Sequence, residues 1–114
     1  MAAGDVAITG DAVLRDSGLR ILTGTVVLDG GNPTPVTLTS YVGSLLFGMV
    51  SMDGSVAPGA DPNYVTSNVA AAVLNVYAWK VTTGGAAGNP TLIASTDNTR
   101  IVDWFAIGTI ARQK

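Results

Sequence analysis

The segment from Arg100 to Ala111, R-I-V-D-W-F-A-I-G-T-I-A, reads as a β-strand with two apolar faces. Successive side chains of a strand point to opposite sides of the sheet. One side therefore carries Val102, Trp104, Ala106, Gly108 and Ile110, and the other carries Ile101, Asp103, Phe105, Ile107 and Thr109. Because a two-sheet sandwich covers only one face of each strand, the second face needs another covering surface. We expect a neighbouring molecule to supply it.

The residue composition favours an all-β fold. All eight acidic residues are Asp, and Lys and Gln, which with Glu fill exposed helix faces, are rare. Val, Thr, Tyr and Trp suit a pleated sheet, while the 14 Gly and 5 Pro supply turns. A chain of 114 residues has the size of one domain. Because its start alternates only weakly, we divide it into an N-terminal arm, residues 1–18, and a β-sandwich domain, residues 19–114.

Turn-forming segments rich in Gly, Pro, Asn and Asp separate short strand candidates along the chain. The seven candidates are Val6–Thr9, Leu19–Asp29, Val36–Ser40, Leu45–Met52, Ala70–Thr82, Thr91–Ser95 and Ile101–Ala111. Strands of this length and spacing are typical of an antiparallel sandwich or barrel. A short helix over Val69–Val76, suggested by three consecutive alanines, is an alternative that the strand-like V-Y-A-W-K-V-T after it argues against.

Charged residues make up only 12% of the chain, against about 25% in an average soluble domain. A weakly charged surface suits a protein that is covered by copies of itself or by a partner. The alternative is a monomer whose surface is polar but uncharged. The net charge of −2 and the scattered basic residues argue against a nucleic-acid partner, which requires a basic stripe.

One charge interrupts an apolar face in each of two central strand candidates: Lys80 in Ala70–Thr82 and Asp103 in the last strand. A buried charge without a partner costs several kcal/mol. If these faces are covered, the carboxylate of Asp103 needs a positively charged partner. This partner is either Lys80, or Arg20 or Arg100 of a neighbouring molecule. The alternative is that Asp103 lies in water near a strand end. We predict a subunit interface at Lys80, Asp103, Trp104 and Phe105.

No set of residues in this sequence predicts catalysis. The chain contains no His and no Cys, so the commonest general base and the commonest metal ligands are missing. Asp53, Asp61 and Asp97 lie in predicted turns, where Asp bonds its own backbone. Calcium binding by Asp29 and Asn32, or by Asp61 and Asn63, is an alternative, but the spacing differs from an EF-hand loop. We expect a protein that is not an enzyme and holds no cofactor or metal.

Three segments in order resemble the H-type lectin-like domain: P-T-P-V-T-L from Pro33, L-N-V-Y-A-W-K-V-T from Leu74, and I-V-D-W-F-A-I-G-T from Ile101. The family has a Pro-Val strand, a V-x-A-x-x-V-T strand and a final V-x-W-x-A-I-G strand in this order. The resemblance implies an antiparallel β-sandwich of six strands, assembled into trimers that sometimes stack as hexamers. It also implies a sugar site at subunit junctions, although family members commonly use a His there. The family's Trp corresponds to Trp104, which we assign to packing.

The chain also resembles small bacteriophage virion proteins in its general character, with a Met-Ala start, few charges, and much Thr, Gly and Ala. This resemblance implies a virion protein assembled in the bacterial cytoplasm. The N-terminus lacks the basic and apolar regions of a signal peptide, and the apolar runs are too short to span a bilayer. We therefore expect a trimeric capsid decoration (cement) protein with the major capsid protein as partner. The capsid-contact candidates are Asp5, Val6, Ile8 and Arg15 within the arm, with the segment Asp53–Asn68 as a contacting loop.

A carbohydrate-binding module in a tail fibre or another receptor-binding position is the alternative function. Sugar sites combine an exposed aromatic ring with planar amides or carboxylates. Tyr64 has such neighbours in a predicted loop. The candidate sugar-binding residues are Asp61, Asn63, Tyr64 and Asn98. Carbohydrate is then the expected partner, and neither expected function involves a membrane.

Overall fold

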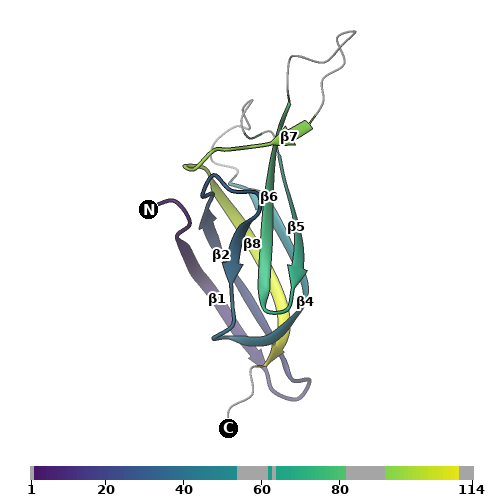
Figure 1. Cartoon of the computed structure of the whole chain (residues 1–114). Coiled ribbons are helices and arrows are strands. Elements are labelled where there is room, and N and C mark those ends of the chain that lie inside the picture. The colour runs from purple at the N-terminus through teal and green to yellow at the C-terminus, as the bar shows by residue number, and fades with distance from the viewer. Residues whose placement is uncertain (1, 54–61, 63, 82–91, 111–114) are drawn as a thin grey trace.

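Every regular element in the described residues is a β-strand, and the strands form two antiparallel sheets (Figure 1). The computed structural model describes residues 2–53, 62, 64–81 and 92–110. The all-β prediction is confirmed. The number of strands in these residues is eight, more than the six or seven expected. The two additions to the predicted pattern are a longer first strand and a strand inside a predicted loop.

Sheet A has the strand order β1-β2-β8-β4. Its strands are β1 (Val6–Leu14), β2 (Leu19–Val27), β8 (Ile101–Ile110) and β4 (Val42–Met52). β8 is one of the two interior strands of the sheet, because it pairs with β2 along one side and with β4 along the other. The segment with two apolar faces is therefore a central strand, as a both-sided apolar pattern indicates.

Sheet B is built around β6 (Val73–Val81), which pairs with β5 (Tyr64–Ala70) along one side. Its other side is shared by two short strands in succession. β3 (Thr34–Thr37) pairs with residues 73–76 of β6, and β7 (Leu92–Ala94) pairs with residues 79–81. In Figure 1 the β5–β6 hairpin lies across sheet A, so the two sheets form the layers of a sandwich.

The core lies between the two sheets. Side chains that are 0% exposed come from both layers: Leu22, Val26, Val102 and Ala106 from sheet A, and Val36, Leu74 and Val76 from sheet B. Each Val or Leu buried in this way contributes roughly 1.5–3 kcal/mol relative to an exposed position. Alternate residues of β8 thus face sheet B, which assigns one of its two apolar faces to the chain's own core.

The N-terminal segment that the sequence analysis set apart as an arm is joined to sheet A. Val6–Leu14 pairs with β2 along its whole length, with a bulge near Thr9. Before it, the Gly4 N–H donates to the Val27 carbonyl at 2.9 Å. Alternation is weak in this segment because β1 is an edge strand that is mostly exposed.

The alanine-rich segment turns the chain between β5 and β6. The strand predicted over Ala70–Thr82 is observed as Val73–Val81, so it begins later than predicted, and the alternative helix is not observed. Ala71 has a φ of 51°, in the left-handed region that suits a tight turn. The predicted loop Asp53–Asn68 is wrong from Tyr64 onward, because these residues form β5. The alternation of β5 is hard to see in the sequence because polar Ser67 takes an inward position opposite Val76.

Several Asp and Asn side chains hold turns, as predicted. The Asp97 carboxylate accepts from the backbone N–H groups of Thr99 and Arg100 at 3.1 and 2.7 Å. Asp29 accepts from the Gly31 N–H at 2.8 Å, and Asn32 accepts from the Ala78 N–H of β6 at 2.8 Å. One carboxylate oxygen of Asp29 and the amide oxygen of Asn32, both in the alternative calcium site, are thus engaged in hydrogen bonds with backbone N–H groups.

Candidate functional site

The outer side of sheet A, facing away from the core, is unusually apolar. Trp104 is 3% exposed and points inward, so its neighbour Phe105 points outward. Cross-strand pairing places Met49 beside Phe105, and Ile107 between Ile21 and Phe47. We name this surface the sheet A face; it consists of Ile21, Phe47, Met49, Phe105 and Ile107. Phe47 and Met49 are 50% and 54% exposed, and the other three are half-buried.

A polar row borders the sheet A face. Asp103 pairs with Thr25 on one side and with Ser51 on the other. A shallow depression of about 190 Å³ lies between β4 and β8, lined by Met49, Val50, Ser51, Asp103, Trp104 and Phe105. It is smaller than the roughly 300 Å³ at which small-molecule sites begin. The depression is therefore too small for a typical small-molecule ligand.

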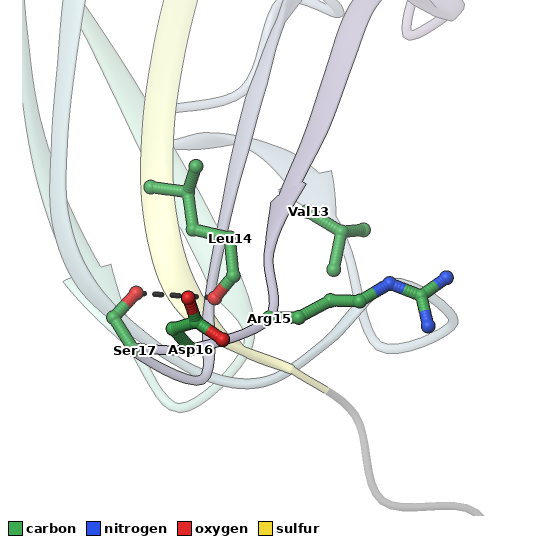
Figure 2. A pocket seen from close by; sticks show the side chains of 5 residues that line it. All are labelled: Val13, Leu14, Arg15, Asp16 and Ser17. Carbon is green, nitrogen blue, oxygen red and sulfur yellow. Dashed lines mark hydrogen bonds between the residues drawn. The ribbon is translucent and has the colours of Figure 1, made fainter.

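A depression of about 530 Å³ lies at the turn between β1 and β2 and is shown in Figure 2. Its lining consists of five consecutive residues, Val13 to Ser17. The Ser17 hydroxyl donates to the Leu14 carbonyl at 3.1 Å and so serves the turn itself. A ligand site gathers polar groups from several elements around a buried volume. This hollow belongs to one turn, and we do not assign it a ligand.

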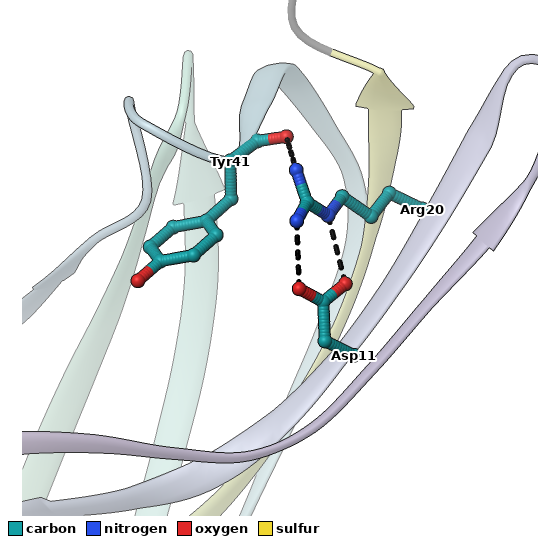
Figure 3. A network of polar contacts seen from close by, with 3 residues as sticks. All are labelled: Asp11, Arg20 and Tyr41. Atoms are coloured by element: carbon teal, nitrogen blue, oxygen red, sulfur yellow. Dashed lines mark hydrogen bonds and ion pairs between the residues drawn. The ribbon is translucent and has the colours of Figure 1, made fainter.

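A polar network joins Asp11, Arg20 and Tyr41 (Figure 3). Arg20 donates two hydrogen bonds to the Asp11 carboxylate, from Nε at 2.8 Å and from Nη2 at 2.6 Å. These hydrogen bonds, with the positive charge of Arg20, lower the pKa of Asp11, although desolvation opposes them. The same hydrogen bonds raise the pKa of Arg20. Arg20 therefore stabilises its own chain, in contrast to its predicted alternative role as the partner of a neighbour's Asp103.

The four predicted interface residues lie on different surfaces. Asp103 and Phe105 point outward from sheet A, whereas Trp104 lies in the core, in agreement with its assignment to packing. Lys80 belongs to β6 of sheet B, on the side opposite Trp79. The structure thus does not bring Lys80 and Asp103 together within one chain, because Asp103 faces away from sheet B.

The capsid-contact candidates lie at the two ends of β1. Asp5 and Val6 are exposed at its start, and the Asp5 carboxylate accepts from the Ala2 N–H at 2.8 Å. Arg15 is exposed in the β1–β2 turn. Ile8 differs from them because it packs against the core.

Only part of the predicted sugar site lies within the described residues. Asp61 and Asn63 fall outside them, as does much of the predicted contacting loop. Tyr64 is 41% exposed at the start of β5, and Asn98 is exposed in the turn before β8. Tyr64 pairs with Trp79 of β6, an aromatic neighbour that the sequence analysis missed. If Tyr64–Ala70 had been predicted as a strand antiparallel to the one that follows it, Tyr64 and Trp79 would have been expected to lie opposite each other.

Two further properties concern the described residues alone. Within residues 2–53, 62, 64–81 and 92–110, no three Asp or other ligand-type side chains gather in a way that would hold a metal ion. The same part of the chain contains no helix long and apolar enough to cross a membrane.

Comparison of the chain with protein-family models, curated proteins and solved structures finds no match in any of the three. The resemblance to the H-type lectin-like domain therefore stays a prediction.

Proposed function

We propose that this protein acts by assembly, as a homotrimeric capsid decoration protein that binds and stabilises a bacteriophage shell. The sheet A face is the observation that supports this proposal most directly. An antiparallel sheet with one solvated face normally carries polar side chains on that face. Here two aromatic and three aliphatic side chains lie together on adjoining strands instead. Such a patch is typical of a surface that another protein covers.

The sheet A face serves as the subunit contact in this proposal. Covering apolar surface stabilises an assembly by roughly 25 cal/mol for each Å² removed from water. The row of Thr25, Asp103 and Ser51 would form the polar rim of the contact, where a charge keeps its hydration. Asp103 then needs no buried partner. The number of subunits, three, comes from the resemblance to the H-type lectin-like domain.

Stabilisation of the shell would follow from mass action. A protein that binds the assembled shell and not its separated subunits raises the free energy of opening it. At a free concentration 100 times the Kd, the gain is about 2.7 kcal/mol for each site. Asp5, Val6 and Arg15 are exposed at the ends of β1 and are the candidate contacts with the major capsid protein.

Light scattering of the purified chain tests the subunit contact. The variant Met49→Lys places a charge within the sheet A face, at a side chain that is 54% exposed and so unimportant for the core. We expect the wild type to be a trimer and this variant a folded monomer. Leu92→Lys is the matched control, since Leu92 is 47% exposed on β7 of sheet B. A monomeric wild type would rule out assembly through this face.

The copy number of the chain in purified virus particles tests the location. We expect a simple ratio to the major capsid protein, which quantitative mass spectrometry of the particles would measure. A few copies in each particle would place the protein at the tail instead. If the chain were missing from particles, the capsid role would be abandoned, whatever the scattering result.

A further inference from the structure

β1 is an edge strand with one open side. Among the strands that the structure describes, only β2 pairs with this nine-residue strand. The opposite edge of sheet A is different, because the Leu45 N–H of β4 donates to the Ala71 carbonyl at 2.7 Å. Natural proteins commonly protect an open edge with Lys or Pro. β1 contains neither, and its one charged residue, Asp11, is bound by Arg20 of the same chain.

Four residues of β1 direct their backbone N–H and C=O groups toward the open side. In an antiparallel pair, opposed residues exchange both hydrogen bonds or none, and the two kinds of pair alternate. The Val27 N–H donates to the Asp5 carbonyl at 3.0 Å, so the backbone groups of Asp5 face β2. At the far end, the Ile110 N–H donates to the Gly18 carbonyl, so Gly18 faces β8 and Leu19 faces β1. Alternation from these two points assigns the open side to Val6, Ile8, Asp11 and Val13.

The side chains of the same four residues point to the side of sheet A that carries the core. Val6 lies opposite Val26 and Asp11 lies opposite Leu22, and both of these partners are 0% exposed. The bulge near Thr9 shifts the alternation by one residue. Even-numbered residues therefore point inward before the bulge and odd-numbered residues after it. The residues that point to the outer side are Ala7, Ala12 and Leu14.

This arrangement fits a second copy of β1 better than a regular strand. Opposed residues of an antiparallel pair lie on the same side of the sheet. A regular strand can meet this condition only by leaving one residue of β1 unpaired, as β2 does at the bulge. A second β1 has the same extra residue at its own middle, so inward residues oppose inward residues along the whole length. The opposed pairs, each formed twice, are Val6 with Val13, Ala7 with Ala12, and Ile8 with Asp11.

We propose that β1 joins two copies of the chain edge to edge about a two-fold axis, so that their two A sheets form one continuous sheet. In this register, residues whose backbone groups face the open side oppose one another: Val6 meets Val13, and Ile8 meets Asp11. Val6 and Val13 are 39% and 42% exposed, so the pairing also removes apolar surface from water. Asp11 keeps its ion pair with Arg20, which belongs to β2 of its own chain.

The edge contact is separate from the sheet A face, whose residues lie on β2, β4 and β8. A backbone hydrogen bond gains little on balance, because water is displaced from both partners, so this contact is the weaker of the two. It forms at high concentration, or between neighbours held on a shell, where the effective concentration is about millimolar. The role on a shell rests on the proposed capsid function. There Val6 contacts another copy, which leaves Asp5 and Arg15 for the major capsid protein.

Disulfide trapping tests the edge pairing, since the chain has no Cys of its own. Ala7 of one copy and Ala12 of the other would form a non-hydrogen-bonded pair with Cα atoms about 4.5 Å apart, which permits a disulfide. After mild oxidation, a mixture of Ala7→Cys and Ala12→Cys should contain several-fold more linked dimer than either variant alone. Ala7→Cys mixed with Leu14→Cys is the matched control, because a shift by two residues leaves the Cα atoms roughly 7–8 Å apart. Every variant also carries Met49→Lys, which removes contact through the sheet A face.

Charges at the valine pair test the same register. Val6→Lys with Val13→Lys places Lys opposite Lys twice and should weaken dimerisation roughly tenfold in sedimentation, whereas Val6→Lys with Val13→Asp places Lys opposite Asp and should restore it. Both positions are exposed, so the fold should tolerate these changes, which circular dichroism checks. Equal cross-linking in the two mixtures, or equal association of the two charge variants, would overturn the edge pairing. A wild type that scatters as a monomer but forms the disulfide between positions 7 and 12 would contradict the sheet A contact alone.

Discussion

Asp11 and Arg20 form a two-pronged ion pair across β1 and β2, with N–O distances of 2.8 and 2.6 Å. The Nη1 atom of the same guanidinium donates to the Tyr41 carbonyl at 3.0 Å, and its Cζ lies 5.2 Å from the centroid of the Tyr41 ring. One side chain thus joins the edge strand, its neighbour and the segment before β4. For this reason, deletion of residues 1–17 would remove part of the sandwich rather than a separate arm.

Replacement of Asp11 should destabilise the fold slightly. Asp11→Ala removes the bidentate partner of Arg20, and partly exposed ion pairs of this kind contribute about 0.2–1 kcal/mol. Urea denaturation would measure the loss, which should shrink at high salt because the pair is screened. Asp16→Ala is the control, since Asp16 is exposed in the β1–β2 turn. Equal stability of the two variants would show that the ion pair contributes nothing.

The contribution of Asp11 should depend on pH. Because Arg20 lowers the folded-state pKa of Asp11 below 3.8, the folded state binds this proton less readily than the unfolded state does. The stabilisation is therefore complete well above pH 3.8 and is lost as the pH falls through the lowered pKa. Denaturation of wild type and Asp11→Asn across this range would reveal it. A stability difference that persists at the lowest pH would contradict this origin.

Gly24 should tolerate no side chain, because it lets β1 and Trp104 approach β2 closely. A Cβ at this position would lie 2.0 Å from the Ala7 carbonyl oxygen and 2.7 Å from the Trp104 ring. Overpacking of this kind costs typically 1–3 kcal/mol, and here backbone is involved, so we expect Gly24→Ala to fall at the upper end. Thermal unfolding would measure it. Gly43→Ala, where the nearest atom is a Thr109 hydroxyl at 3.2 Å, should lose much less.

Replacement of Trp104 and of Phe105, which are adjacent in sequence, should affect different properties: the first the stability of the fold, the second the assembly of subunits. Trp104 is 3% exposed, so Trp104→Ala leaves a cavity and should cost about 3–5 kcal/mol of folding free energy. Phe105 lies on the sheet A face, so Phe105→Ala should weaken assembly while the monomer keeps most of its stability. Denaturation at low concentration and light scattering at high concentration separate the two effects. Equal loss in both assays for both variants would contradict the assignment of faces.

Ala71→Gly should stabilise the β5–β6 turn. Ala71 has a φ of 51°, a conformation that costs an L-residue roughly 1–2 kcal/mol. Glycine avoids that strain but loses more entropy on folding, so the net gain should be about 1 kcal/mol or less. Ala70→Gly is the control and should be destabilising, because Ala70 ends β5 in an ordinary strand. Chemical denaturation of both variants should move the midpoints in opposite directions.

Most elements of the fold were predictable because their pattern is local. The last strand, predicted as Ile101–Ala111, is observed as Ile101–Ile110, and the strand predicted from Leu19 is Leu19–Val27. Such strands are identified by a run of Val, Ile and Leu that is bounded on each side by turn-forming residues. Edge strands lack this pattern, since they are solvated on more than one side. For the same reason, β5 and the second half of β1 were missed.

The candidate surfaces were predictable only in part. Period-two alternation shows that Trp104 and Phe105 point in opposite directions, but it does not say which of them meets the second sheet. The group formed by Phe105, Met49 and Phe47 depends on the register between β8 and β4, which includes two irregularities. No local pattern specifies such a register, because a shift by one residue exchanges the faces of the strand.

The sequence by itself determined the all-β class, the central position of the last strand and the turn-forming roles of Asp residues, because each depends on the chemistry of neighbours along the chain. The tertiary structure decided that the first strand is an edge of sheet A. It also decided that Asp11 rather than Asp103 pairs with Arg20, and that Tyr64, Tyr77 and Trp79 share one surface. These relationships join residues from different strands, and only the packing of two sheets around a common core sets which strands lie side by side.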